Sequence, residues 1–182
     1  MNKYIIGVLF CMMAFSCDDE ADDNPFCERY EEGTLLIGMR DDVSVQQSFD
    51  LFNSYGLHIA SMAVPYYESS LPGDSIQYVV QYLNSKEYIN SNGFRAVEGG
   101  SVYLHYQTQA LTVVCNFWNM TLENQQDWIE TTSVLKLTEK PLPKSFVLTV
   151  PVGEEKKWVT TFKNAETIRW AELNCDAQIF PG

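Results

Sequence analysis

The sequence predicts an α+β fold built from two β-α-β units that stand far apart in the chain. A strand-helix-strand pattern covers residues 34–62, and a second one covers residues 146–173. The long stretch between the two units has helix and hairpin patterns of its own.

The first unit has clear signals for both ends of its helix. Residues 34–40 form a strand candidate, and Ser44 with Gln47 three residues later has the form of a capping box. Apolar residues then recur at helical spacing up to Gly56, a residue that suits a helix C-terminus. The second strand of this unit is predicted over residues 57–62.

The second unit repeats this order. Residues 146–150 form a strand candidate, and the glutamates at 154–155 favour a helix N-terminus through the helix dipole. The final strand is predicted over residues 167–173, where strict alternation puts Ile168 and Trp170 on the same sheet face.

The insertion between the units spans about residues 63–144. A helix is predicted over residues 75–83, a β-hairpin over residues 101–117 and another helix after Thr121, before two prolines mark a linker. Two β-α-β units form the split β-α-β, or ferredoxin-like, sandwich. We therefore expect that fold with a helix and β-hairpin insertion between strands 2 and 3. The hairpin either extends the main sheet or packs on it as a subdomain.

Several short stretches of the two units carry residues that are typical of a known protein family. They are Leu36-Ile37-Gly38-Met39-Arg40, Val43-Ser44, Phe49, Tyr55-Gly56-Leu57, Val150-Pro151-Val152-Gly153-Glu154-Glu155, Trp158, Phe162 and Ile168-Arg169-Trp170-Ala171-Glu172-Leu173-Asn174. Together these stretches resemble subtilisin-type protease prodomains, the inhibitor-like propeptide family. The resemblance implies a ferredoxin-like fold and, as an alternative function, inhibition of a peptidase. Prodomains of this family join their second and third strands by a short turn, where this chain has its insertion.

The first sixteen residues resemble a bacterial lipoprotein signal peptide. Lys3 precedes an apolar run that is too short to cross about 30 Å of hydrocarbon as a permanent helix, but its length suits a signal. Ser16-Cys17 ends a stretch similar to a lipobox, which would make Cys17 the first mature residue and the lipid carrier. The alternatives are an ordinary cleaved signal and a short membrane anchor.

An acidic tether is predicted over residues 17–32. Residues 18–32 carry eight acidic groups and one basic group. Such a run resembles the surface-export signal of some Gram-negative lipoproteins, and like-charge repulsion would also keep a solvated tether extended. We expect an outer-membrane lipoprotein of the cell envelope, held on the membrane by its N-terminal lipid and exposed at the cell surface.

Residues 33–182 are expected to form a single α+β domain, because about 150 residues suffice for one real core. They carry sixteen acidic and ten basic groups. This modest acidity excludes a nucleic-acid partner, which requires a basic surface.

The cysteines predict one disulfide bond. The compartment is oxidising, and Cys27, Cys115 and Cys175 allow one bridge with one thiol left over. Cys115 lies in an apolar run and is expected to be buried, which leaves Cys27 to pair with Cys175. The first and last strands of the expected sheet are antiparallel neighbours, which also brings these two cysteines together.

No motif for catalysis, cofactor binding or metal binding stands out. His58 and His105 are the two histidines, and the chain has no HExxH, CxxC, GxSxG or Gly-rich phosphate loop. Asp41 and Asp42 are adjacent in a turn and therefore point apart, whereas acid–base catalysis needs convergent groups. We expect no enzyme activity, no catalytic residue, no cofactor and no metal site.

Aromatic residues are the candidates for a binding surface. Trp118, Trp128, Trp170, Tyr66 and Tyr67 are the residues that we single out. Trp170 belongs either to the core or to the open face of the sheet, and the two other tryptophans flank the end of the hairpin and the following helix. The tyrosines suit either a sugar platform or a domain seam, since tyrosine has an apolar body and a polar tip.

A candidate modification site lies at the start of the insertion. Asp74-Ser75-Ile76 resembles the three-residue O-glycosylation signal of some Gram-negative secreted proteins, with Ser75 as the acceptor. The competing interpretation is that Asp74 or Ser75 caps the following helix.

These observations predict a non-enzymatic, membrane-anchored lipoprotein that acts as a protein-interaction module of the cell envelope. The alternatives are a peptidase inhibitor of the prodomain type and a glycan-binding surface lipoprotein.

Overall fold

The computed structural model describes residues 27, 29–63, 65–89, 100–105 and 107–175, so the predictions for Cys17 and the rest of the first 26 residues lie outside the described part. In chain order, its elements are β1 (Tyr30–Met39), α1 (Val45–Ser54), β2 (His58–Ala63), β3 (Tyr66–Ser69), the short 3-10 helix η1 (Gly73–Ser75), α2 (Ile76–Asn84), β4 (Gly100–Leu104), β5 (Leu111–Cys115), β6 (Phe117–Met120), α3 (Leu122–Val134), β7 (Leu137–Glu139), β8 (Lys144–Thr149), α4 (Glu155–Lys163) and β9 (Ile168–Cys175).

The first sheet combines strands from both ends of the chain. Its strand order is β6-β2-β8-β1-β9, and all neighbouring strands are antiparallel. Helix α1 connects β1 to β2, and α4 connects β8 to β9. Each of these connections passes over a strand that comes from the other unit. The prediction of an α+β fold is confirmed.

The second sheet is formed by the middle of the chain. Its strand order is β4-β5-β3-β7, again antiparallel. The predicted hairpin is present as β4 and β5, but its return strand is interrupted at Asn116. The chain continues from there as β6, which pairs with β2 at the edge of the first sheet. The hairpin region therefore belongs to the second sheet and also extends the first.

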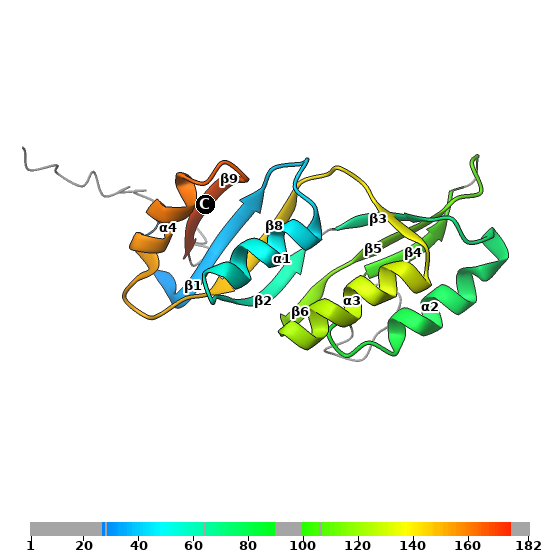
Figure 1. Ribbon diagram of the computed structural model, residues 1–182, viewed down its shortest axis with the longest axis horizontal. Coiled ribbons are helices and arrows are strands. Elements are labelled where there is room, and N and C mark those ends of the chain that lie inside the picture. Colours follow the sequence, from blue (N-terminus) through cyan, green and yellow to red (C-terminus); the bar gives the residue numbers. More distant parts are fainter. Residues whose placement is uncertain (1–26, 28, 64, 90–99, 106, 176–182) are drawn as a thin grey trace, which may run out of the picture.

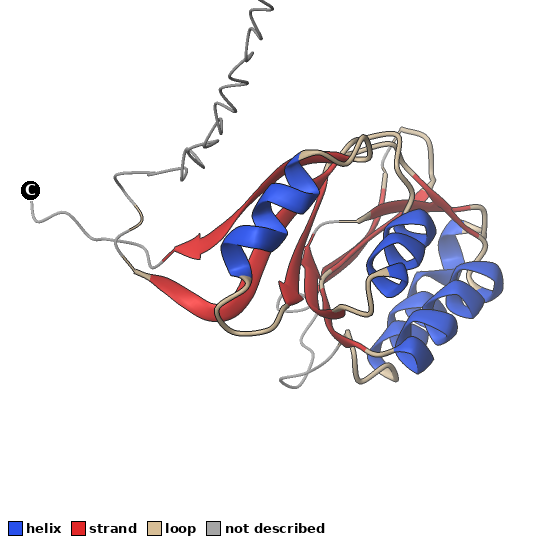
Figure 2. Ribbon diagram, turned by 60° about the vertical axis from the view of Figure 1, so that its left-hand side comes forward, coloured by secondary structure: helices blue, strands red, loops and turns tan. Residues whose placement is uncertain are grey.

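The α-helices α1, α2, α3 and α4 lie on the same side of the two sheets (Figures 1 and 2). Phe52 of α1 packs against Phe146 of β8 and Phe162 of α4, with ring centroids 5.1 and 5.8 Å apart. Trp128 of α3 packs against Phe117 of β6 at 4.5 Å. The core lies between this helical layer and the sheets, and within the described residues no helix covers the opposite side.

The two predicted helix starts are present as local hydrogen-bond motifs. The Ser44 hydroxyl accepts from the Gln47 amide at 3.2 Å, and the Gln47 side chain accepts from the Ser44 amide at 2.8 Å, which completes the capping box. Thr121 caps α3 by accepting from the amide of Asn124 at 3.2 Å. Gly56 follows α1 with a φ of +67°, a conformation that favours glycine.

A β-bulge in β9 overturns the predicted alternation of Ile168 and Trp170. Ile168 pairs with Met39 and Trp170 pairs with Gly38, so Arg169 is an extra residue between two consecutive positions of β1. An extra residue in one strand shifts the following side chains to the opposite face. Ile168 is consequently buried toward the helices, whereas Trp170 lies on the helix-free face of the sheet.

The predicted disulfide bond joins Cys27 to Cys175, whose Cα atoms are 5.4 Å apart. Tyr30 pairs with Cys175 at the start of β1, so the bond closes the end of the β1–β9 pair. This pair lies at one end of an elongated molecule, and α2 with the β4–β5 hairpin lies at the other (Figure 1). Cys115 is a free, buried thiol, as predicted.

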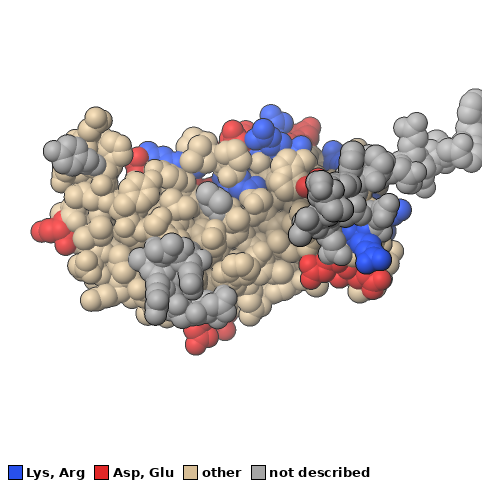
Figure 3. Space-filling model, turned by 180° about the vertical axis from the view of Figure 1, so that it is seen from behind, with Lys and Arg blue, Asp and Glu red and all other residues tan. Residues whose placement is uncertain are grey.

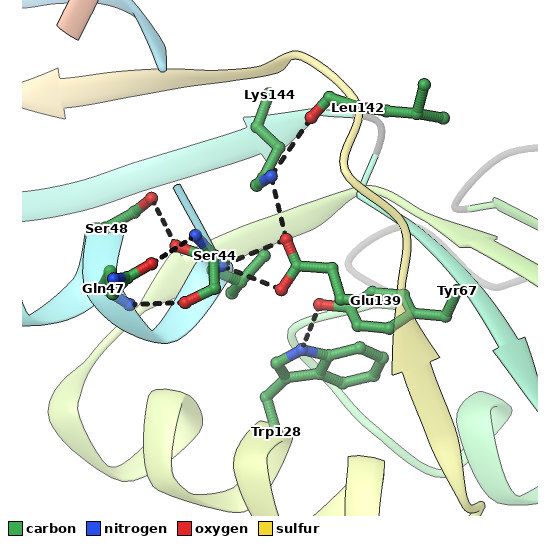
Figure 4. Close-up of polar contacts among 9 residues, drawn as sticks. Ser44, Gln47, Ser48, Tyr67, Trp128, Glu139, Leu142 and Lys144 are labelled. Atoms are coloured by element: carbon green, nitrogen blue, oxygen red, sulfur yellow. Dashed lines mark hydrogen bonds and ion pairs between the residues drawn. The ribbon is translucent and has the colours of Figure 1, made fainter. Parts of the chain in front are cut away.

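A buried ion pair connects the end of the second sheet to the first (Figure 4). The Glu139 carboxylate lies 2.9 Å from the ammonium group of Lys144 and accepts from the backbone amide of Val45, the first residue of α1, at 2.9 Å. Lys144 also donates to the carbonyl of Leu142 at 3.1 Å and is only 3% exposed. These bonds fix β7, β8 and α1 relative to one another.

Candidate binding surface

The helix-free side of the first sheet presents two rows of side chains, which we call the open face. The first row crosses β6, β2, β8, β1 and β9 through Trp118, Ser61, Val147, Leu36 and Glu172. The second row crosses β2, β8, β1 and β9 through Ala63, Ser145, Gly38 and Trp170. A tryptophan therefore borders the open face on each of its two edge strands.

Trp170 lies directly against the backbone of Gly38. A Cβ atom added to Gly38 would be 2.2 Å from both Cε2 and Nε1 of the indole. The ring therefore occupies the space in which any other residue would place its side chain. One side of the indole is held by the sheet, and the side chain remains 38% exposed.

Trp118 occupies the opposite edge and is 41% exposed. Its neighbour Phe117 is fully buried toward α3, so Trp118 points to the helix-free side. The amide of Trp118 donates to the carbonyl of Tyr88 at 2.7 Å, which holds the outer edge of β6. Five strands at about 4.8 Å spacing place the two edge strands about 19 Å apart.

The strip between the two tryptophans carries only small and aliphatic side chains: Ser61, Ala63, Leu36, Ser145 and Val147. These residues are half-buried, as expected for a sheet face without a covering layer. Figure 3 shows this side of the molecule, where lysine, arginine, aspartate and glutamate gather mainly along the edges. The open face is therefore largely uncharged, with Glu172 at its border.

A second aromatic pair lies on the corresponding side of the second sheet. The hydroxyl groups of Tyr66 and Tyr103 are 2.7 Å apart and hydrogen-bonded. Thr112 lies on the strand between them and is only 2% exposed. Tyr66 is half-buried, and its hydroxyl partner is Tyr103, a residue that the sequence analysis did not single out.

Two of the predicted surface residues are buried instead. Trp128 is fully buried and donates from Nε1 to the hydroxyl of Tyr67 at 3.1 Å, and their rings are 5.3 Å apart. Burial, followed by the negative charge of Glu139, raises the pKa of Tyr67. The prediction that these two residues contribute to a binding surface is wrong, because both lie in the core, where the hydroxyl of Tyr67 accepts the hydrogen bond of the Trp128 indole.

A groove of about 280 Å³ separates α1 from α3 on the helical side of the molecule. Its lining side chains come from these two helices alone and are Gln46, Phe49, Asp50, Asn53, Leu122, Gln125, Gln126 and Ile129. Sequence reasoning did not find this groove, because it depends on which helices become neighbours.

Glu155 has a role that the helix-dipole prediction missed. Its carboxylate accepts from the backbone amide of Gly33 at 2.7 Å and from that of Gly153 at 2.9 Å. The bond from Gly33 is the main reason that the pKa of Glu155 is lowered. The Glu155 carboxylate therefore links the start of α4 to β1 by a hydrogen bond, at the end of the molecule that contains the disulfide bond.

The potentially reactive side chains do not converge. His58 and His105 are both exposed. His58 begins β2 of the first sheet, whereas His105 directly follows β4 of the second sheet. Burial raises the pKa of Cys115 to about 12, so its thiol is not a nucleophile at neutral pH. Among the residues that the structure describes, no group of three histidine, cysteine, aspartate or glutamate side chains could hold a metal ion.

Ser75 lies in the turn before α2, and its side chain makes no capping hydrogen bond. Asp74 is exposed in the same turn. The capping interpretation of this motif is therefore not supported for Ser75, a half-buried residue at the end of the molecule that bears α2.

Comparison of the chain with protein-family models, curated proteins and solved structures finds no match. Within the described residues, no helix has the length and apolar character needed to cross a membrane.

Proposed function

We propose that this chain is a non-enzymatic lipoprotein of the Gram-negative cell envelope that binds a protein partner through its open face. The observation that carries the proposal is the pair of exposed tryptophans on the two edges of a largely uncharged, helix-free sheet face. Exposed apolar patches with polar surroundings mark sites at which proteins bind partners.

The tryptophans suit the role of anchors. Tryptophan is enriched among the residues that dominate binding energy at protein interfaces, whereas charged residues are depleted at their centres. Trp170 is already held against Gly38, so little conformational freedom would be lost when a partner covers it. The expected partner presents an uncharged, apolar surface, such as a helix face that fits between the two aromatic side chains.

The fold part of the proposal is that the first sheet with α1 and α4 is a ferredoxin-like unit. The order β2-β8-β1-β9, with helices connecting β1 to β2 and β8 to β9, supports this assignment. In such a unit the two helices cover one face, which leaves the other available for binding.

The anchoring part of the proposal places the lipid on Cys17, ten residues before the disulfide-bonded Cys27. In that arrangement the disulfide end lies near the membrane, and the second sheet points away from it. Growth with a radiolabelled fatty acid should label the wild-type chain and leave Cys17→Ser unlabelled. Equal labelling of both chains would reject Cys17 as the lipid carrier.

Site-specific photo-crosslinking in living cells tests the partner. A photoreactive residue at 118, 147 or 170 should yield the same crosslinked species. Two exposed tyrosines serve as control positions and should not, namely Tyr55, which directly follows α1, and Tyr78 of α2. Ser61→Arg adds a charge to the strip and should abolish the crosslink from position 147. Crosslinks that are equally strong from the control positions, or that survive Ser61→Arg, would exclude the open face.

The peptidase-inhibitor alternative is a second proposal, because a helix-free sheet face is also what a prodomain-like inhibitor would offer to a protease. Unchanged activity of a subtilisin-like protease in the presence of micromolar chain would reject it. The disulfide at Cys175 restrains the chain where the last strand ends, which makes this the weaker candidate.

A further inference from the structure

We propose that the groove between α1 and α3 is a binding site for a neutral saccharide of one or two rings. The site lies among the helices, on the side of the molecule opposite to the open face (Figure 1). The proposal is independent of the protein-binding function, and either can fail without the other.

The groove is polar where two packed helices would ordinarily be apolar. Four of its eight lining side chains are primary amides, namely Gln46, Asn53, Gln125 and Gln126, and one more is the carboxylate of Asp50. No lysine, arginine or histidine lines it. A primary amide both donates and accepts hydrogen bonds, as a sugar hydroxyl does, so the two groups are complementary.

The floor of the groove is preorganised. The Asn53 amide donates to the Gln125 carbonyl oxygen at 2.8 Å, and the Gln125 amide donates to the backbone carbonyl of Met120 at 2.8 Å. Gln125 is only 6% exposed. These bonds hold the two helices at a fixed separation and orient the amides without help from a ligand.

The rim offers hydrogen-bond acceptors that have no partner among the described residues. Gln46 donates to one oxygen of Asp50 at 2.9 Å, and Gln126 donates to Glu130 at 3.1 Å. The other oxygen of Asp50 and the side-chain carbonyls of Gln46 and Gln126 accept no hydrogen bond within the described part of the chain. A ligand with several hydroxyl donors matches this arrangement, whereas an anion would be repelled by Asp50.

Leu122 supplies an apolar contact at the mouth of the groove. It is 70% exposed and is the most exposed large apolar side chain among the described residues. It contributes almost nothing to the core, and its exposed side chain can cover the carbon face of a sugar ring. The volume of about 280 Å³ lies just below the range of about 300–1,000 Å³ for small-molecule sites, which limits the ligand to one or two rings.

Titration of the ¹⁵N-labelled full chain with glucose, galactose and N-acetylglucosamine tests the proposal, with side-chain amide signals as the readout. At least one sugar should shift the signals of Asn53, Gln125 and Gln126 in a saturable manner, with a dissociation constant of about 1–10 mM for so small a ligand. Gln126→Ala removes one exposed acceptor and should weaken binding about three- to tenfold. Gln77→Ala, which removes an exposed glutamine from α2, is the matched control and should change nothing.

Three results would overturn the proposal. One is the absence of saturable shifts with all three sugars at about 50 mM, a concentration that would detect even weak binding. Another is equal weakening by Gln126→Ala and Gln77→Ala. The third is a response to choline but to no sugar, which would show that Asp50 selects a cation.

Discussion

Replacement of Gly38 by alanine should push Trp170 off the sheet. An alanine Cβ would be 2.2 Å from two atoms of the indole, whereas ordinary van der Waals contact begins near 3.4 Å. The ring would have to retreat by about 1.2 Å or rotate into solvent. No comparable rearrangement is available to β1, because its backbone is paired with β8 on one side and β9 on the other.

The cost of this displacement can be bounded from both sides. Inserting a methyl group into a packed site typically costs about 1–3 kcal/mol. Complete ejection of Trp170 would expose the roughly three fifths of its side chain that are now covered. That area is about 120 Å² and corresponds to about 3 kcal/mol. We therefore expect Gly38→Ala to lower the free energy of unfolding by about 2 kcal/mol, within a ceiling near 3 kcal/mol.

A double-mutant cycle measured by urea unfolding isolates this contact. In a Trp170→Ala background the obstacle is gone, and Gly38→Ala should be neutral or should stabilise by up to about 1 kcal/mol, because alanine restricts the unfolded chain more than glycine. The coupling energy between the two positions should then be about 2–3 kcal/mol. Fluorine NMR of fluorotryptophan-labelled protein should show one of the four tryptophan signals moved by Gly38→Ala.

Additive effects of Gly38→Ala and Trp170→Ala, with a coupling energy below about 0.5 kcal/mol, would refute the reasoning. Such a result would mean that the indole does not rest on Gly38 in solution. It would also remove the rigid anchor on which the proposed protein-binding function depends.

Three further predictions concern stability. Replacing both Cys27 and Cys175 by serine opens a loop with a sequence separation of 148 and should cost about 5 kcal/mol in the chain-entropy model, seen as a fall of about 10–20 °C in melting temperature; a fall below about 3 °C would contradict this. Glu155→Gln should destabilise the protein by about 1–3 kcal/mol at neutral pH. The folded-state pKa of Glu155 is lowered, so its contribution to stability is present above the ordinary pKa of about 4.3 and is lost as the pH falls through the lowered value. Urea titrations at pH 7 and at about pH 2 should therefore show a difference between wild type and variant only at the higher pH. Lys144→Met should cost about 3 kcal/mol by urea unfolding, since it leaves the Glu139 carboxylate in the junction without its cation, and the double replacement with Glu139→Leu should recover part of that loss.

The parts of the fold that local chemistry determines could be predicted from the sequence. The capping box of Ser44 and Gln47 and the cap formed by Thr121 each involve residues three positions apart, so the sequence contains both partners. The disulfide could be predicted because only a few pairings of the cysteines exist, and the apolar surroundings of Cys115 remove the alternatives.

Features that depend on distant neighbours could not be predicted. Strand β3 has four residues and β7 has three, and both are too short for a recognisable period of apolar residues. They form because β3 pairs with β5, and β7 in turn pairs with β3. The sequence predicts Tyr67 and Trp128 as surface candidates, because nothing local indicates the hydrogen bond that joins them in the core. The bulge at Arg169 cannot be predicted from the sequence either, since it arises where two residues of β1 face three residues of β9.

The pairing of Gly38 with Trp170 is difficult to explain by folding alone. A glycine in the interior of a strand is about 0.5–1 kcal/mol worse than alanine, and a tryptophan that is 38% exposed leaves part of its apolar surface in water. An aliphatic residue at position 38 opposite a threonine at position 170 would avoid both costs and would suit the sheet equally well. The observed pair instead creates a flat, rigid aromatic surface on a sheet face that no described helix covers. A partner that covers this indole would bury apolar area already held in place, which is why the open face, rather than the more polar helical side, is where we expect a protein to bind.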